Sequence, residues 1–277
     1  MICIAGKNDI AVNSSRYLLN EYGIDPRELV ILPNDDDRGY DSWQKSLKKF
    51  ALDNDLRIVE LEELYPEEDL FFISLEFNRI INIDKFNSKR LFNIHFSLLP
   101  KYKGMYTSVT PILNGDMSSG VTLHKIDKGI DTGDIIAQIE FEIDINDTAR
   151  DLYFKYNQYG FQLFKENIDS LIKNSFISRQ QSKLGSTYWG KNTIDFSRIE
   201  IDFNKSSFEI HNQIRAFIFK EYQLPTINGF QIKKSILTDK RKGRDSQIID
   251  QGEYFEITGI DGYIILAYKE VYKETQI

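Results

Sequence analysis

The sequence predicts an α/β fold: a Rossmann-like, mostly parallel sheet with helices on both faces, followed by a smaller β-rich C-terminal domain. Two observations support this class. Up to residue 173, short apolar runs of strand length alternate with amphipathic runs of helical length, which is typical of a parallel sheet with crossover helices. Beyond residue 180 the pattern changes to strand-like runs separated by glycine turns, which indicates a second domain.

In the first domain, expected at residues 1–180, each element has a local reason. Short runs rich in apolar residues predict strands at 1–5, 29–32, 70–75, 91–96, 120–126 and 135–143. Helical spacing predicts helices at 41–52, 107–113 and 147–173. Residues 6–12 are expected to form a loop, after which Asn13, Ser14 and Ser15 offer an N-cap for a helix that ends near residue 21.

The second domain is expected at residues 181–277. A serine followed by amphipathic spacing predicts a capped helix at 206–219. Residues 230–271 are strand-like, with turns expected at Gly243, Gly252 and Gly262. We therefore expect a small β-rich unit that carries one helix.

Composition limits the class of function. Hydrophobic residues make up 41% of the 277 residues, which is enough for a packed core. The net charge of -7 and the near balance of basic and acidic residues after residue 180 argue against a nucleic-acid surface. The single cysteine, Cys3, cannot form an intramolecular disulfide. No charged leader and no long apolar run are present, so the sequence predicts a cytoplasmic protein that does not cross a membrane.

Neither a metal nor a nicotinamide cofactor is expected. Three histidines and one cysteine supply a zinc site poorly. Asp35, Asp36 and Asp37 are consecutive, but such runs between a strand and a helix are more often solvated turns. No GxGxxG pattern follows the first strand, which disfavours an oxidoreductase of Rossmann type.

One stretch of the chain contains the side chains best suited to catalysis. Asn93 and His95 are two residues apart in an apolar run, so in a strand they point to the same face. The run breaks at Pro100 and Gly104, which places both side chains where a strand opens into a loop. A second loop, at residues 131–134, carries carboxylates. An amide that holds a carbonyl oxygen, an imidazole that moves a proton and a carboxylate that orients the imidazole suit acyl or formyl transfer.

At these residues the chain resembles the folate-dependent formyltransferase family. The resemblance rests on Asn93-Ile94-His95, on Ser97-Leu98-Leu99-Pro100 with Tyr102 and Gly104, and on Asp131-Thr132-Gly133-Asp134. It implies that Asn93, His95 and Asp131 are catalytic, that N10-formyltetrahydrofolate is the donor, and that no metal is needed. The family pattern favours Asp131 over Asp134, which is expected to close the turn. Ser97 is not expected to be a nucleophile, because no second histidine is placed to activate it.

The resemblance also implies a folate site. Arg79 and Ile81 match positions that meet the pterin region, although a surface arginine and a core isoleucine would explain the same two residues. Backbone groups of one loop are expected to hold the pterin, and the residues concerned are Asp127, Gly129, Ile130 and Asp131. His124, in a predicted strand, is expected to be structural.

The last hundred residues resemble only the nucleotide-sugar branch of the family. Arg215 lies four residues after His211, on the same side of the predicted helix, and an arginine there suits a diphosphate. An ordinary amphipathic helix is the competing interpretation. The residues that we expect to contact the sugar nucleotide are Ser97, Tyr102, Lys103, Trp189, Arg215 and Tyr222.

The predicted function is therefore formyl transfer to the amine of a dTDP-linked amino-dideoxy sugar, for O-antigen or another surface glycan. A 3-amino-3,6-dideoxyhexose is favoured over a 4-amino sugar. A glycinamide ribonucleotide enzyme would be expected to end near residue 200, and a tRNA enzyme to carry a basic C-terminal domain. The alternative from another class is a module that binds folate or a nucleotide sugar without catalysis. A homodimer is expected from the resemblance.

Overall fold

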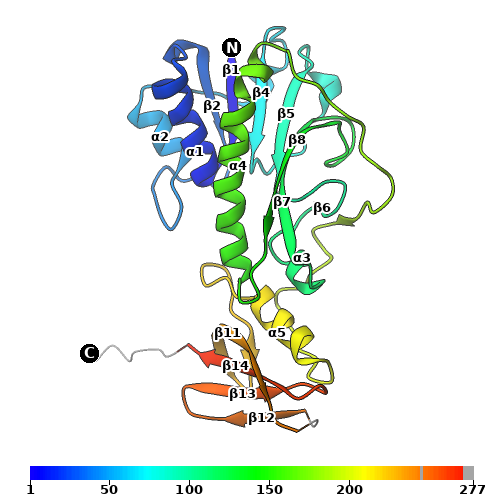
Figure 1. Cartoon of the computed structure of the whole chain (residues 1–277). Coiled ribbons are helices and arrows are strands. Elements are labelled where there is room, and N and C mark those ends of the chain that lie inside the picture. The colour runs from blue at the N-terminus through cyan, green and yellow to red at the C-terminus, as the bar shows by residue number, and fades with distance from the viewer. Residues whose placement is uncertain (244–245, 271–277) are drawn as a thin grey trace, which may run out of the picture. The chain divides into compact units, whose positions relative to one another are not determined.

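The computed structural model describes residues 1–243 and 246–270 (Figure 1). The chain forms two compact units. The first consists of Met1–Gly104, Gly120–Glu140 and Lys155–Tyr188, and the second of Met105–Ser119, Phe141–Phe154 and Trp189–Ile277 as far as it is described. The segments of the two units alternate along the chain. The single domain boundary expected near residue 180 stays a prediction.

The first unit is built on a seven-stranded sheet with the order β3-β2-β1-β4-β5-β7-β8. β1 is parallel to β2 and β4, β2 to β3, and β4 to β5, whereas β7 runs antiparallel to β5. The predicted Rossmann-like, mostly parallel sheet is therefore confirmed. The strands are β1 (Ile2–Gly6), β2 (Leu29–Pro33), β3 (Arg57–Ile58), β4 (Phe71–Leu75), β5 (Arg90–His95), β7 (Ser118–Lys125) and β8 (Ile135–Glu142).

The first helix differs from its prediction. α1 spans Asn8–Tyr17, so the loop expected at 6–12 is wrong. The polar residues taken as a cap lie inside the helix: Ser14 and Ser15 are buried, and the Ser15 hydroxyl donates to the Ala11 carbonyl at 2.8 Å. Serine can satisfy its hydroxyl within a helix in this way, and the apolar pattern alone does not reveal it.

Each of the next three helices is shorter than its predicted range. α2 (Leu47–Asp53) begins after Ser46, whose hydroxyl accepts from the Lys49 N–H, so the predicted start at residue 41 is wrong. α3 (Thr110–Leu113) and α4 (Ala149–Ile172) lie within their predicted ranges. A π-helical turn (Leu18–Tyr22) and three 3-10 turns (Pro26–Glu28, Leu61–Leu64, Ile83–Lys85) complete the set before β5.

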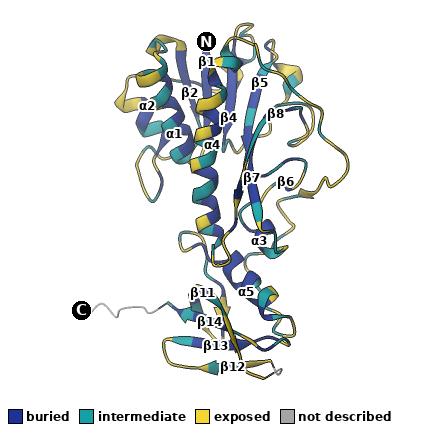
Figure 2. Ribbon diagram, viewed as in Figure 1, coloured by how far each residue is buried: buried dark blue, intermediate teal, exposed yellow. Residues whose placement is uncertain are grey.

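The strands β1, β2 and β4 are almost wholly buried (Figure 2), and different elements cover the two faces of the sheet. A Cβ on Gly160 of α4 would lie 2.7 Å from Ile10 of α1 and 3.6 Å from Ile94 of β5, so α1 and α4 share the face to which Ile94 points. The other face carries a cluster that joins strand residues such as Cys3 to Leu61 and Leu64 of a 3-10 turn. Because strand side chains alternate, Asn93 and His95 point away from α4.

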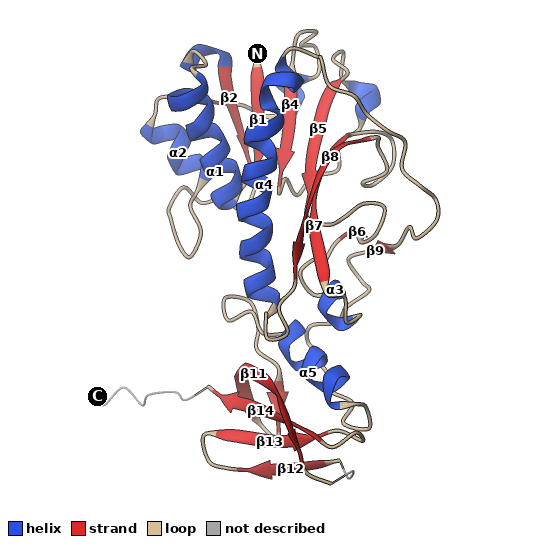
Figure 3. Cartoon of the chain, viewed as in Figure 1, coloured by secondary structure: helices blue, strands red, loops and turns tan. Residues whose placement is uncertain are grey.

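The second unit contains a five-stranded antiparallel sheet with the order β10-β11-β14-β13-β12 (Figure 3). α5 (Ser207–Ala216) begins at the predicted Ser206 cap, and its Ile210 and Ile214 belong to the same core cluster as sheet residues. The predicted turn residues Gly243, Gly252 and Gly262 lie between strands, whereas Val271 lies outside the described residues. The strands are β10 (Thr226–Ile227), β11 (Phe230–Arg241), β12 (Gln247–Asp250), β13 (Tyr254–Thr258) and β14 (Tyr263–Lys269).

None of the described helices is both long and apolar enough to span a membrane. Outside the two large sheets, β6 (Lys103–Gly104) pairs with β9 (Tyr188–Trp189). This small pair joins the loop after β5 to the segment that follows α4.

His211 of α5 gives the second unit a predicted pH dependence. Its Nε2 bonds the Ile145 carbonyl and its Nδ1 the Ser235 hydroxyl, both at 2.7 Å. Burial lowers the pKa of His211 to about 4, opposed by the bond to Ile145 and reinforced by the charge of Arg215. An unfolded histidine titrates near 6.5, so the stability that the neutral ring provides is complete above about pH 6.5. It is lost as the pH falls toward 4, because the unfolded chain then binds the proton more tightly.

We therefore expect the free energy of unfolding to fall by about 2 kcal/mol between pH 7 and pH 5 on account of this group. Urea unfolding of the wild type and of His211→Gln at the two pH values measures the effect. The free energy of unfolding should depend less on pH in the glutamine variant than in the wild type. An equal change between the two pH values in both proteins would contradict the assignment to His211.

Candidate active site

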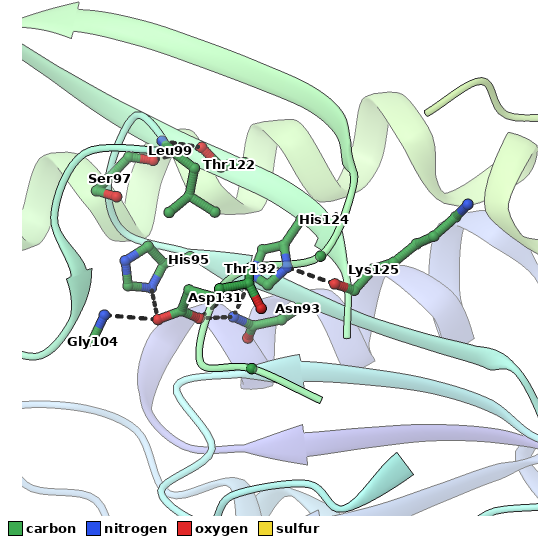
Figure 4. A network of polar contacts seen from close by, with 12 residues as sticks. Asn93, His95, Ser97, Leu99, Gly104, Thr122, His124, Lys125, Asp131 and Thr132 are labelled. Atoms are coloured by element: carbon green, nitrogen blue, oxygen red, sulfur yellow. Dashed lines mark hydrogen bonds and ion pairs between the residues drawn. The ribbon is translucent and has the colours of Figure 1, made fainter. Parts of the chain in front are cut away.

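β5 presents Asn93 and His95 side by side at its carboxyl end (Figure 4). His95 is the last residue of the strand and is 8% exposed. Its Nε2 lies 2.8 Å from the Tyr102 carbonyl oxygen, in the loop that follows. The strand thus fixes the ring from one side, and the loop fixes it from the other.

Asp131 completes the group. Its Oδ1 accepts from the Asn93 amide at 3.3 Å, its Oδ2 accepts from the Gly104 N–H at 2.8 Å, and Oδ2 also lies 3.4 Å from His95 Nδ1. Burial by itself raises the pKa of Asp131, but the charge of His95, the hydrogen bond and charge of His124 and the Gly104 N–H outweigh it. The pKa of Asp131 therefore lies well below its ordinary value, and the side chain is a carboxylate at neutral pH.

His124 belongs to the same network, although the sequence suggested a structural role. Its Nε2 lies 3.0 Å from the Asn93 amide nitrogen and 3.5 Å from Asp131 Oδ1. The register of the sheet causes this, because β7 runs antiparallel to β5 and pairs His124 with Asn93. No local pattern in the sequence contains that pairing.

The hydrogen-bond partners assign the two histidine tautomers. A backbone carbonyl only accepts, so His95 donates from Nε2 to Tyr102 and keeps a lone pair on Nδ1 when neutral. His124 donates from Nδ1 to the Lys125 carbonyl at 2.7 Å, so its Nε2 accepts from Asn93 when the ring is neutral and presents a proton to Asp131 Oδ1 when the ring is charged. A proton taken up by His95 Nδ1 would face the Asp131 carboxylate, the arrangement that stabilises an imidazolium.

The loop that carries Asp131 is held tightly. Asp131 has a φ of 53°, a left-handed conformation that costs a non-glycine residue about 1–2 kcal/mol. At Gly133 a Cβ would lie 1.8 Å from the Lys125 carbonyl oxygen, so only glycine fits there. Asp134 is paired with Lys125 at 3.6 Å and accepts from Ser178, which places it outside the catalytic network.

The loop after β5 uses two of the predicted substrate residues for its own structure. The Ser97 hydroxyl is fully buried and donates to the Lys101 carbonyl at 2.7 Å. Tyr102 is 6% exposed and contributes its carbonyl to His95. Lys103 is half-buried, and its ammonium group donates to Ser186 at 3.1 Å. Of the three, only Lys103 presents a charged group near the surface.

The residues predicted to bind folate differ in their surroundings. Arg79 lies over the Phe77 ring at 5.4 Å, and its Nε and Nη2 are buried without a hydrogen-bond partner among the described residues. Such unpaired donors require an explanation. Ile81 is 9% exposed and belongs to the core cluster, which supports the core interpretation. In the loop, Asp127 binds Gly129 N–H and the Thr132 hydroxyl, and Ile130 is 40% exposed.

In the second unit, Arg215 is hydrogen-bonded to residues of its own unit. The side chain is 1% exposed, and its guanidinium donates to Asn212 Oδ1 and to the carbonyls of Asp144 and Asp147. These bonds secure a buried cation inside the unit, which supports the competing interpretation of an ordinary packed helix, and the contact of Arg215 with a diphosphate stays a prediction. Tyr222 is 62% exposed and packs on Phe219, and Trp189 of β9 is half-buried. Both aromatic side chains remain candidates for substrate contact.

Comparison with known proteins gives matches over most of the chain. Residues 60–168 match the family model described as formyl transferase. A methionyl-tRNA formyltransferase of Coxiella burnetii is 30% identical over 230 residues, which cover 78% of this chain and 72% of that protein. A methionyl-tRNA formyltransferase of Clostridium beijerinckii is 28% identical over 269 residues, which cover 90% and 84%.

Two solved structures are more similar. The sugar 3N-formyl transferase WlaRD, determined in the presence of dTDP and 5-N-formyl-THF, is 56% identical with a TM-score of 0.94 and covers 97% of both chains. An N-formyltransferase from Helicobacter canadensis, in complex with folinic acid and dTDP-3-aminofucose, is 53% identical with a TM-score of 0.95. It covers 97% of this chain and 99% of its own.

Proposed function

The chain belongs to the formyl transferase family, and we propose that it transfers a formyl group from N10-formyltetrahydrofolate to the amine of a dTDP-linked amino-dideoxy sugar. The observation that carries the proposal is the group formed by Asn93, His95 and Asp131, with contacts of 3.3 and 3.4 Å to the carboxylate. The identity of 53–56% with sugar N-formyltransferases over nearly the whole chain supports the acceptor class.

The chemistry follows from the groups present. The sugar amine attacks the formyl carbon, and the carbonyl oxygen becomes an oxyanion to which the Asn93 amide would donate. His95 takes up the proton that the amine loses, and Asp131 stabilises the resulting imidazolium. Collapse of the intermediate breaks the bond between the formyl carbon and N10, and the imidazolium of His95 gives its proton to N10, which releases tetrahydrofolate and restores the neutral ring. The unpaired donors of Arg79 support its assignment to the pterin region.

We favour a 3-amino-3,6-dideoxyhexose as the acceptor over a 4-amino sugar. The support is that both of the more similar structures are described with a 3-amino specificity or a 3-aminofucose ligand. The methionyl-tRNA enzymes are less similar, and the acidic net charge of -7 disfavours a tRNA acceptor. A role in O-antigen or other surface-glycan synthesis and a homodimer stay predictions from the resemblance, and a cytoplasmic location stays a prediction from the sequence.

A direct test is to incubate the protein with N10-formyltetrahydrofolate and a panel of dTDP- and UDP-linked 3-amino and 4-amino sugars. We expect mass spectrometry to detect formylation of the dTDP-linked 3-amino sugar, with slower or no reaction of the others. Formylation of only a 4-amino sugar would correct the position of the amine. Binding without formylation of any acceptor, glycinamide ribonucleotide included, would favour the non-catalytic module.

A further inference from the structure

We infer that residues 178–187, here called the connecting segment, position the catalytic pair of His95 and Asp131 through two side chains, Gln181 and Thr187. The segment follows α4 and leads to β9. The significance of the positioning for turnover rests on the proposed function, whereas the positioning itself does not.

Gln181 secures the loop that carries Asp131. Its Nε2 donates to the carbonyl of Asp131 at 2.9 Å and to that of Gly133 at 2.7 Å, so both amide hydrogens are used on this one loop. The backbone carbonyl of Asp131 is thus fixed at the residue that adopts the left-handed conformation. Next to Gln181, Arg179 exchanges two backbone bonds of 2.8 Å with Ile135, which attaches the segment to the start of β8.

Thr187 secures the loop that faces His95. Its hydroxyl accepts from the Tyr102 N–H at 2.7 Å, and its carbonyl accepts from the Lys103 N–H at 3.0 Å. The peptide between Tyr102 and Lys103 is therefore held at its N–H by Thr187, while its carbonyl accepts from His95 Nε2 at 2.8 Å. Thr187 also donates its own N–H to the Pro100 carbonyl at 3.2 Å.

Gln181 bonds the loop of Asp131, and Thr187 bonds the loop that holds His95, so the two side chains act on the two partners of one contact. The loop after β5 and the loop after β7 come from distant parts of the sequence, and the 3.4 Å contact between His95 and Asp131 depends on their relative placement. The connecting segment is bonded to both loops within ten residues. Loss of either side chain should let one partner shift against the other, and a displacement of about 1 Å can lower a catalytic rate by 10²-fold.

The test compares Gln181→Leu and Thr187→Val with Gln180→Leu, the same substitution at an exposed neighbour. Hydrogen–deuterium exchange reports on the loops, and steady-state kinetics report on turnover. Gln181→Leu should speed exchange in residues 127–135 and lower kcat on the order of 10²-fold, with little change in KM for the amino sugar. Thr187→Val should speed exchange in residues 99–104 with a smaller fall in kcat. Gln180→Leu should resemble the wild type.

The exchange readout separates this inference from the proposed function, because it needs no turnover. Wild-type protein that fails to formylate any acceptor would overturn the function, and exchange in the variants would still decide the positioning. Unchanged exchange and unchanged kcat in Gln181→Leu would overturn the inference. If Gln181→Leu does not fold, Thr187→Val decides, because it removes one hydroxyl and keeps both backbone bonds. Faster exchange in residues 99–104 together with a lowered kcat supports the inference. Wild-type values of both exchange and kcat overturn it.

Discussion

Replacing Asp131 by asparagine is expected to lower kcat for formyl transfer by about 10³- to 10⁴-fold, the effect known for a carboxylate that orients a catalytic histidine. Both carboxylate oxygens face N–H donors, with Asn93 at Oδ1 and Gly104 at Oδ2. An asparagine must turn its NH2 group toward one of them and loses that bond. The negative charge that would stabilise an imidazolium at His95 is lost as well.

Asp134→Asn is the matched control, since it makes the same change in the same loop. Asp134 is paired with Lys125 and Ser178 near the surface, so its variant should retain kcat within a few-fold of the wild type. Circular dichroism of both variants checks that the fold persists. A folded Asp131→Asn enzyme with more than a tenth of the wild-type kcat would remove Asp131 from the mechanism, and an inactive Asp134→Asn would transfer the role to Asp134.

The parts of the site that follow local rules could be predicted from the sequence. Asn93 and His95 share a face because side chains alternate along a strand, and they lie at its end because the apolar run breaks at Pro100. Asp131 followed from the family motif. The parallel sheet followed from alternating strand and helix patterns, and the turns of the second unit followed from their glycines.

The parts that were missed depend on contacts between distant segments. His124 reaches the site because β7 pairs antiparallel with β5, and the composition of β7 does not encode its register. Arg215 was expected to contact a diphosphate because an arginine suits that group, and the sequence did not show that the side chain is bonded to Asn212 and to the backbone carbonyls of residues 144 and 147. Gln181 lay at the expected domain boundary, where nothing local showed that its amide contacts the loop around Asp131.

Replacing Asn93 by alanine is expected to lower kcat by about 10²- to 10³-fold, the typical effect of removing one oxyanion donor. The structure adds a condition to this role. Both hydrogens of the Asn93 amide are in use, one toward His124 at 3.0 Å and one toward Asp131 at 3.3 Å. The longer bond is the weaker one, so we expect the oxyanion to take the hydrogen that points to Asp131, while His124 keeps the amide oriented.

Since the donor acts on a charge that forms only during the reaction, the loss should appear in kcat with little change in either KM. Asn93→Asp should be slower still, because it replaces the donor by a second carboxylate beside Asp131. Asn87→Ala is the control. It also removes a hydrogen bond donated by a side-chain amide, in this case to the Pro66 carbonyl at 3.0 Å, and it should leave kcat unchanged. If Asn93→Ala raised KM alone and kept kcat, Asn93 would be a ground-state binding residue, and the oxyanion would require another donor.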